Sequence, residues 1–184
     1  MSLKTLNIDT TWSLFLDRDG VINERIIGDY IKKVKEFHFL PGVLEALHVF
    51  ANKFGKVFVV TNQQGIGKGL MNETDLTVIH DHMLAEIKAH GGHIHKIYHS
   101  PYRAEENSVF RKPNPGLARK AKIDFPDIDF EKAIMVGDSI TDMQFGRNTG
   151  MKTVFITSEK EQYEDNSDLI DFVFADLKGF AGTF

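Results

Sequence analysis

Two carboxylates stand two positions apart in the segment Leu16-Asp17-Arg18-Asp19-Gly20, directly after a short apolar run. Close carboxylates repel each other and raise each other's proton affinity unless a cation lies between them. The pair therefore points either to a bound Mg²⁺ or to a division of labour between an acid and a base. A solvated turn would have the same residues, so the meaning of the pair depends on the rest of the chain.

A second polar segment follows the β-branched run Lys56–Val60, where Thr61, Asn62 and Gln63 come in succession. Three glycines stand just beyond it, Gly65, Gly67 and Gly69. Hydroxyl and amide groups beside glycines can grip an oxyanion, because glycine lets backbone N–H groups approach closely. The alternative is a polar loop that caps the helix expected from Glu73.

Two later segments add cations and further carboxylates. Arg111 and Lys112 stand before an expected helix, where a lysine can neutralise phosphoryl oxygens as charge develops. Asp138 follows a glycine at the end of another apolar run, and Asp142 comes four residues later. Asp138 can ligate a metal while Asp142 orients Lys112 or a metal-bound water, although the same segment would serve equally well as a helix cap.

These segments need a scaffold that brings them together, and the apolar runs supply one. Short runs typical of buried strands alternate with stretches of helical periodicity. The expected strands are Trp12–Leu16, Lys56–Val60, Ile94–Tyr98, Ala133–Val136, Thr153–Ile156 and Phe172–Phe174. The expected helices are Gly42–Phe54, Glu73–His90, Pro115–Ile123 and Thr141–Thr149. This alternation predicts an α/β fold with a doubly wound, mostly parallel sheet covered on both faces.

In sheets of this kind, ligands bind beyond the carboxyl ends of the strands, at a topological switch point. Asp17, Thr61 and Asp138 all stand at the ends of expected strands. We therefore expect them to meet in one site. The stretches 20–61 and 61–111 leave no room for a separate cap domain, so we expect an open site within a single domain over residues 1–184.

Composition limits the partners and the location. The chain has 184 residues, a net charge of -4 and no cysteine. A negative chain has no global attraction for nucleic acid, and no apolar run approaches the ~20 residues that span a bilayer. The absence of cysteine removes disulfides and thiolate metal sites. We expect a cytoplasmic protein, a monomer or small homo-oligomer, with a small-molecule partner and neither nucleic acid nor membrane.

Taken together, the four segments resemble the motifs of the haloacid dehalogenase-like phosphatases, over a match from Leu14 to Ile156. The Asp-Arg-Asp-Gly-Val-Ile-Asn opening, the Thr-Asn-Gln turn and the Arg-Lys-Pro segment are similar to the branch with heptose bisphosphate and histidinol phosphate phosphatases. The resemblance implies a magnesium-dependent phosphatase of carbohydrate metabolism, with the 7-phosphate of a heptose bisphosphate as the first substrate and histidinol phosphate as the second. A polynucleotide 3′-phosphatase and a non-catalytic binding domain are the alternatives.

The same resemblance implies a role for each residue. Asp17 attacks phosphorus, while Asp19 protonates the leaving alcohol and later activates water. Thr61 holds phosphoryl oxygens and Lys112 stabilises the transition state, with Asp142 in support. The implied ligands of Mg²⁺ are Asp17, the backbone carbonyl of Asp19, and Asp138. The implied substrate contacts are Asn23, Arg25, Tyr30, Asn62, Gln63 and Arg111.

One departure from the branch concerns zinc. Heptose bisphosphatases often carry a zinc loop of three cysteines and a histidine, but the apparent ligand positions here hold Ser100, Tyr102, Ser108 and Phe110. We therefore expect no zinc, and a loop stabilised by packing. Three nearby histidines, His93, His95 and His99, are expected to point to different faces of a strand and to be solvated or hydrogen-bonded.

Overall fold

The computed structural model describes residues 3–159 and 166–184. Its centre is a six-stranded sheet in which all neighbouring strands are parallel, in the order β3-β2-β1-β4-β5-β6. The strands are β1 (Ser13–Leu16), β2 (Lys56–Asn62), β3 (Lys96–Ser100), β4 (Ala133–Gly137), β5 (Lys152–Ile156) and β6 (Phe172–Phe174). The prediction of a doubly wound α/β fold is confirmed.

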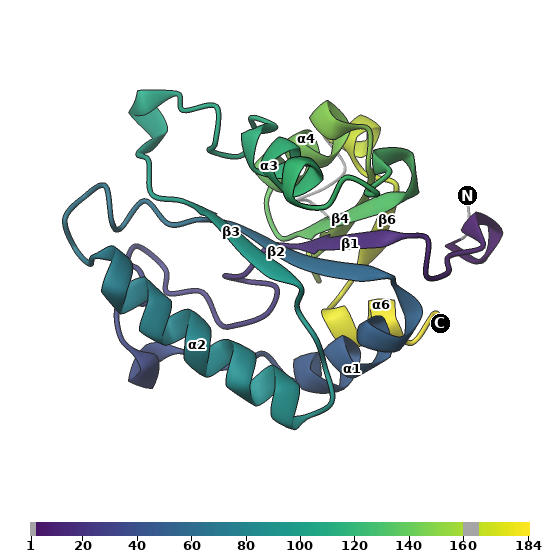
Figure 1. Ribbon diagram of the computed structural model, residues 1–184, viewed down its shortest axis with the longest axis horizontal. Coiled ribbons are helices and arrows are strands. Elements are labelled where there is room, and N and C mark those ends of the chain that lie inside the picture. The colour runs from purple at the N-terminus through teal and green to yellow at the C-terminus, as the bar shows by residue number, and fades with distance from the viewer. Residues whose placement is uncertain (1–2, 160–165) are drawn as a thin grey trace.

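Helices cover both faces of the sheet (Figure 1). One face carries α1 (Val43–Lys53), α2 (Glu73–Ala89) and α6 (Leu177–Ala181). The other face carries α3 (Gly116–Asp124) and α4 (Ile140–Thr149). Short 3-10 turns precede β1 or lie between the strands and helices: η1 (Leu3–Leu6), η2 (Val34–Glu36), η3 (Ala104–Glu106), η4 (Phe130–Lys132) and η5 (Ser167–Leu169). None of the described helices is long and apolar enough to cross a membrane.

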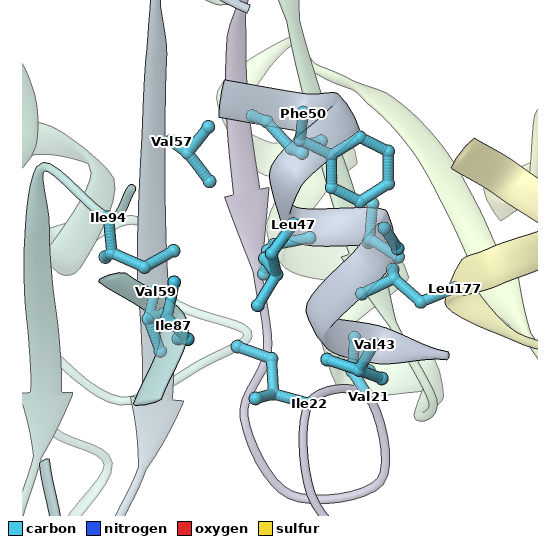
Figure 2. Close-up of a cluster of buried hydrophobic side chains, with 14 of the residues drawn as sticks. Val21, Ile22, Val43, Leu47, Phe50, Val57, Val59, Ile87, Ile94 and Leu177 are labelled. Carbon is cyan, nitrogen blue, oxygen red and sulfur yellow. The ribbon is translucent and has the colours of Figure 1, made fainter. Parts of the chain in front are cut away.

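The apolar runs form strands because both of their faces are buried. In β1, Leu14 and Leu16 belong to the hydrophobic cluster under α1 and α2, whereas Phe15 belongs to the cluster under α3 and α4. Figure 2 shows the first cluster, in which Leu47 and Phe50 of α1 pack beside strand residues such as Val57. This two-sided burial explains why the central strands β1, β2 and β4 are nearly continuous apolar runs, whereas the partly exposed edge strand β3 is not.

The predicted boundaries hold to within two residues for the six strands and four helices. The main difference that bears on function is that β2 continues through Thr61 and Asn62, which pair with His99 and Ser100 of β3. The expected polar loop therefore starts two residues later. Helix α6 and the 3-10 turns were not expected, because each is too short to show a period in the sequence.

The strand order places β1 between β2 and β4. The chain thus builds one half of the sheet outward from β1 to β3, then crosses to the other side and builds β4 to β6. The carboxyl ends of β1, β2 and β4 consequently meet at a switch point, where a doubly wound sheet opens a crevice. Between β1 and α1, in the stretch where some α/β proteins insert another domain, the only helical turn described is η2.

Candidate active site

Asp17 lies directly after β1, at the switch point of the sheet. Its backbone N–H donates to the carbonyl of Val136 in β4, with a distance of 2.9 Å. Its Oδ1 accepts a hydrogen bond from the backbone N–H of Arg18 at 2.7 Å and lies 2.8 Å from Nζ of Lys112. Only 9% of the residue is exposed. Asp17 is thus a fixed, nearly buried carboxylate at the floor of a crevice.

Lys112 is buried beside Asp17 and is held from several directions. Its Nζ lies 2.6 Å from Oδ1 of Asp142 and donates to the carbonyl of Val60 at 2.8 Å. Its backbone forms two hydrogen bonds with the side-chain amide of Asn62, one in each direction, at 3.0 and 3.1 Å. Asn62 therefore fixes the segment that carries Lys112, a function that its sequence position did not reveal.

A group of three carboxylates is formed by Asp17, Asp138 and Asp142, each of which offers an oxygen within 4.8 Å of the others. Oδ1 of Asp138 is buried without a hydrogen-bond partner, while its Oδ2 accepts from Arg25 at 3.1 Å. Gly20 has a φ of +92°, and a Cβ there would lie 1.9 Å from Oδ2 of Asp138. Only glycine fits this approach of the two loops.

This group carries more negative charge than its cations offset. Burial, together with the nearby Asp142 and Asp138, raises the pKa of Asp17 to about 7 even though Lys112 opposes the shift. Burial and Asp142 likewise raise the pKa of Asp138 to about 6 against the effect of Arg25. Burial alone would lower the pKa of Lys112, but Asp142 and Asp17 outweigh it and raise it. Clustered carboxylates with a buried unpaired oxygen fit a hard divalent cation such as Mg²⁺.

Asp19 has a contrasting environment. Arg18 donates to its two oxygens through Nε and Nη2 at 2.9 to 3.3 Å, Asn23 donates to Oδ1 at 2.9 Å, and Gln63 donates to Oδ2 at 2.8 Å. Burial would raise the pKa of Asp19, but Arg18, Asn23 and Gln63 outweigh it and lower it. Gln63 also donates to Oγ1 of Thr61 at 2.9 Å. Asp19 is therefore a fully paired carboxylate.

A cleft of about 620 Å³ opens over these side chains. Most of the residues predicted for the site line it: Asp17, Asp19, Arg25, Tyr30, Thr61, Asn62, Arg111, Lys112 and Asp142. Asp138 lies beside Asp17 and faces a neighbouring cavity of about 410 Å³. The four segments thus meet in space as predicted.

The structure corrects the placement of two residues predicted to bind substrate. Asn23 and Gln63 are buried, with 0% and 1% exposure, and neither lines the cleft. Their side-chain amides are used to hold Asp19. The expected placement was wrong because Gln63 directly follows β2 and Asn23 lies in the loop after β1, where a side chain can turn inward as readily as outward.

The glycine-containing loop after β2 also differs from expectation. The N–H groups of Gly67 and Gly69 donate to the carbonyls of Pro101 and Ile66, and that of Lys68 donates to Gln64. These N–H groups are therefore paired with backbone carbonyls of the loop itself or, for Gly67, of the segment after β3, and are not directed at an oxyanion. The loop contributes a side chain that was not predicted, because Lys68 lines the cleft and its Nζ donates to the hydroxyl of Tyr30 at 3.0 Å.

The loop from Ser100 to Phe110, which stands where the branch often has its zinc loop, contains hydrogen bonds in addition to the expected packing. Arg111 donates through Nη1 to the carbonyl of Tyr102 and through its N–H to that of Ser108, both at 3.0 Å. Tyr102 and Phe110 are 38% and 41% exposed, and the Oγ of Ser100 is buried without a hydrogen-bond partner. The polar contacts of Arg111 therefore help to fix the loop.

The nearby histidines form pairs with other groups. The rings of His93 and His95 lie 4.5 Å apart, so the expectation of different faces was wrong for this pair: residues two apart in an extended segment share a face. His95 Nδ1 accepts from the N–H of Val57 at 3.1 Å, and His99 Nε2 lies 2.8 Å from a carboxylate oxygen of Glu73. Both of these histidines are hydrogen-bonded, as predicted.

Comparison with known proteins places this geometry in a family. The family described as HAD-hydrolase-like matches residues 109–180. D-glycero-alpha-D-manno-heptose-1,7-bisphosphate 7-phosphatase from Campylobacter jejuni is 39% identical over 155 residues, covering 84% of this chain and 87% of that protein. The enzyme of the same name from Mycobacterium bovis is 39% identical over 137 residues, covering 74% and 72%.

Among solved structures, D,D-heptose 1,7-bisphosphate phosphatase from B. bronchiseptica, complexed with magnesium and phosphate, superposes with a TM-score of 0.85. The two chains are 28% identical, and the match covers 94% of this chain and 97% of that one. The fold and the site therefore define a hydrolase of the haloacid dehalogenase-like class. Within that class, the chain belongs to the phosphatases of the heptose bisphosphate branch.

Proposed function

We propose that this protein is a magnesium-dependent phosphatase that removes the 7-phosphate of a D-glycero-D-manno-heptose 1,7-bisphosphate through an aspartyl-phosphate on Asp17. The observation that carries the proposal is the meeting of Asp17 with Lys112 at 2.8 Å and with the carboxylate of Asp138, at the switch point of the sheet. The names of the relatives supply the substrate class.

The proposed reaction transfers the phosphoryl group twice. First, a carboxylate oxygen of Asp17 attacks phosphorus, the bond from phosphorus to the ester oxygen breaks, and Asp19 gives a proton to the departing alkoxide. Then water gives a proton to Asp19 and attacks the aspartyl-phosphate, which releases inorganic phosphate and restores Asp17. Lys112 neutralises charge that develops on the phosphoryl oxygens, and Thr61 donates to one of them.

Asp17, the backbone carbonyl of Asp19, and Asp138 are the proposed holders of Mg²⁺. The fit rests on the excess of carboxylates and on the buried, unpaired Oδ1 of Asp138. The ion supplies positive charge that lets a dianionic ester approach a carboxylate nucleophile. Asp142, paired with Lys112 at 2.6 Å, holds the lysine in place.

Asp19 requires a change of protonation during the cycle. Its pKa is lowered in the free protein, so it starts as a carboxylate. A dianionic ester placed beside it raises its proton affinity, because like charges disfavour a second ionised group. A carboxylate that begins ionised and gains affinity for a proton as substrate arrives suits a group that must both give and take a proton.

Cationic side chains at the wall of the cleft support a substrate with two phosphates. Arg25, Lys68 and Arg111 all line it, together with Tyr30. One phosphate can lie against Asp17 and Lys112 while the wall offers cations for the other. We further propose that the chain works as a single domain in the cytoplasm. We also propose that it binds no zinc, because the loop from Ser100 to Phe110 has hydroxyl and aromatic groups, which are poor zinc ligands.

A substrate panel tests the proposal. Purified protein with Mg²⁺ is assayed against both anomers of heptose 1,7-bisphosphate, histidinol phosphate, a 3′-phosphorylated oligonucleotide and 4-nitrophenyl phosphate. We expect the highest kcat/KM for one heptose bisphosphate anomer. A preference for histidinol phosphate or for the oligonucleotide would contradict the substrate assignment, and no hydrolysis of any ester would contradict the enzymatic role.

A further inference from the structure

Arg18 is the most unusual side chain near the site because it is charged and completely buried, with 0% exposure. A buried guanidinium is costly unless its N–H groups find acceptors. Nε and Nη2 of Arg18 are paired with Asp19, and Nη1 lies 3.1 Å from Nε2 of His80, which is 62 positions away in the chain. His80 is thus the partner of Arg18 on the side facing away from Asp19.

The pairing fixes the protonation state of His80. A guanidinium has only donors, so Nε2 of His80 must be the acceptor, and the ring proton must sit on Nδ1. The surroundings agree, because burial, followed by Arg18 and then His99, lowers the pKa of His80 to about 3. His80 is consequently a neutral imidazole with one defined tautomer.

The fold holds His80 rigidly in this position. It lies in α2, whose buried residues Leu76, Ile79 and Met83 pack into the hydrophobic cluster beneath the sheet. The helix begins at a reciprocal cap in which Asn72 and Asp75 each accept a hydrogen bond from the other's backbone N–H at 2.9 Å. Figure 1 shows α2 as a straight helix beneath β2 and β3. His80 is therefore a fixed acceptor mounted on a secondary-structure element.

We propose that His80 is a positioning residue for acid–base catalysis: it fixes the guanidinium of Arg18, and Arg18 in turn holds the carboxylate of Asp19. This inference rests on the proposed function, in which Asp19 transfers protons. Nothing in the pairing requires His80 to contact the substrate or to titrate during the reaction. Its contribution is to keep Arg18 in the one orientation that serves both oxygens of Asp19.

The proposal predicts a dependence on the leaving group. A sugar alkoxide is a poor leaving group that needs a proton from Asp19, whereas 4-nitrophenolate leaves without one. When the acceptor of His80 is removed, Nη1 of Arg18 is left buried and unpaired, and Arg18 must shift to find another partner. Asp19 then loses its placement, and phosphoryl transfer to Asp17 should slow far more for the sugar ester than for the aryl ester.

The first test compares three variants with these two kinds of ester. In single turnovers, which report phosphoryl transfer before the intermediate is hydrolysed, His80→Leu should lower the rate of alcohol release from the heptose bisphosphate by about 10-fold or more. The rate of 4-nitrophenol release from 4-nitrophenyl phosphate should stay near wild type. In His80→Gln, the rate of alcohol release from the sugar ester should lie within about threefold of wild type, since the amide oxygen of glutamine can accept the same hydrogen bond. His82→Gln, in the same helix beside Phe37, is the matched control and should change neither reaction.

Equal losses of the single-turnover rate of alcohol release for the two esters in His80→Leu would show a merely structural role and overturn the proposal, as would no loss for either. If His80→Leu does not fold, the comparison of His80→Gln with the control still decides: a loss for the sugar ester much larger than the expected threefold would overturn the acceptor role.

A second test uses the wild-type protein and no catalysis. Ring-nitrogen NMR shifts of His80 should show an unprotonated Nε2 and a protonated Nδ1 from pH 5 to pH 8, whereas a protonated Nε2 would overturn the proposal. The two tests separate this inference from the proposed function. A protein with the expected tautomer but no phosphatase activity would contradict the function alone.

Discussion

Asp17 and Asp19 stand two residues apart, but their environments are opposite. Asp17 lies among carboxylates, and its pKa is raised to about 7 by burial, Asp142 and Asp138. Asp19 is enclosed by donors from Arg18, Asn23 and Gln63, and its pKa is lowered. The first half of the site, around Asp17, has more negative than positive charge. In the second half, around Asp19, donors of the chain pair both carboxylate oxygens. The comparison teaches that the first half is built to be completed by a cation, whereas the second is built by the chain alone.

The largest expected effect comes from removing the nucleophile in the first half. Asp17→Asn should lower kcat by at least about 10³-fold for every ester, because the amide cannot form the aspartyl-phosphate. The fold should remain intact, since the change removes a charge from a region with too many negative ones. Steady-state kinetics and thermal unfolding check the two parts. Turnover close to wild type would exclude Asp17 as the nucleophile.

Removing the metal from the first half of the site should also abolish hydrolysis, and this loss should be reversible. EDTA should abolish hydrolysis and Mg²⁺ should restore it. In addition, Mg²⁺ should raise the Tm of the substrate-free protein, because an ion that binds only the folded state stabilises it. Asp138→Asn should remove this rise in Tm, while Asp81→Asn on the exposed side of α2 should keep it. A Tm that does not respond to Mg²⁺ in the wild type would contradict the metal site.

A smaller, selective effect is expected in the second half. Asp19→Asn should lower kcat by about 10²-fold for the sugar ester, within the usual range for general acid–base catalysis, and far less for 4-nitrophenyl phosphate in the phosphoryl-transfer step. Single-turnover measurement of the released alcohol checks this step without interference from hydrolysis of the intermediate. Equal losses for the two esters would make the two aspartates alike and break the comparison.

The smallest effect concerns the stability of the folded state in acid. His80 stays neutral when folded, with a pKa of about 3, but an unfolded chain takes up a proton near pH 6.5. The unfolded state therefore binds more protons between these values, and stability falls as pH decreases through 6.5, by at most about 1.4 kcal/mol per pH unit.

Asp17 acts in the opposite sense, since its raised pKa makes the folded state the better proton acceptor between about pH 7 and its ordinary value of 3.8. The difference between wild type and His80→Gln isolates the histidine, whose ring faces Arg18, His99 and Asp19. Urea unfolding of the wild type and of His80→Gln from pH 7 to pH 5 measures how the free energy of unfolding of each protein changes with pH. Identical slopes would contradict a buried neutral His80.

The sequence predicted the elements and the meeting of four segments, because buried parallel strands have a strong local pattern and their carboxyl ends share one edge. It also predicted that Asp142 orients Lys112 or a metal-bound water, and Oδ1 of Asp142 lies 2.6 Å from Nζ of Lys112. These successes depend on backbone topology. They required only that Asp17, Thr61 and Asp138 stand at or next to the carboxyl ends of strands.

The sequence did not predict which way side chains turn beyond the strand ends. Asn23 and Gln63 were expected to bind substrate, but their side chains are buried and donate to Asp19. Asn62 forms hydrogen bonds with the backbone of Lys112. The contact between Arg18 and His80 joins residues 62 positions apart through tertiary packing alone. A lone histidine on a helix gives no signal of such a role in a single sequence.

The account depends most directly on a covalent intermediate at Asp17. The wild-type protein is mixed with excess heptose bisphosphate and Mg²⁺, quenched in acid during turnover and reduced with borohydride, which converts an acyl phosphate of aspartate to homoserine. We predict homoserine at position 17 in the peptide mass spectrum and unmodified aspartate at position 19. Homoserine at position 19, or none at either position while phosphate is being released and a known aspartyl-phosphate enzyme is trapped in parallel, would contradict the account.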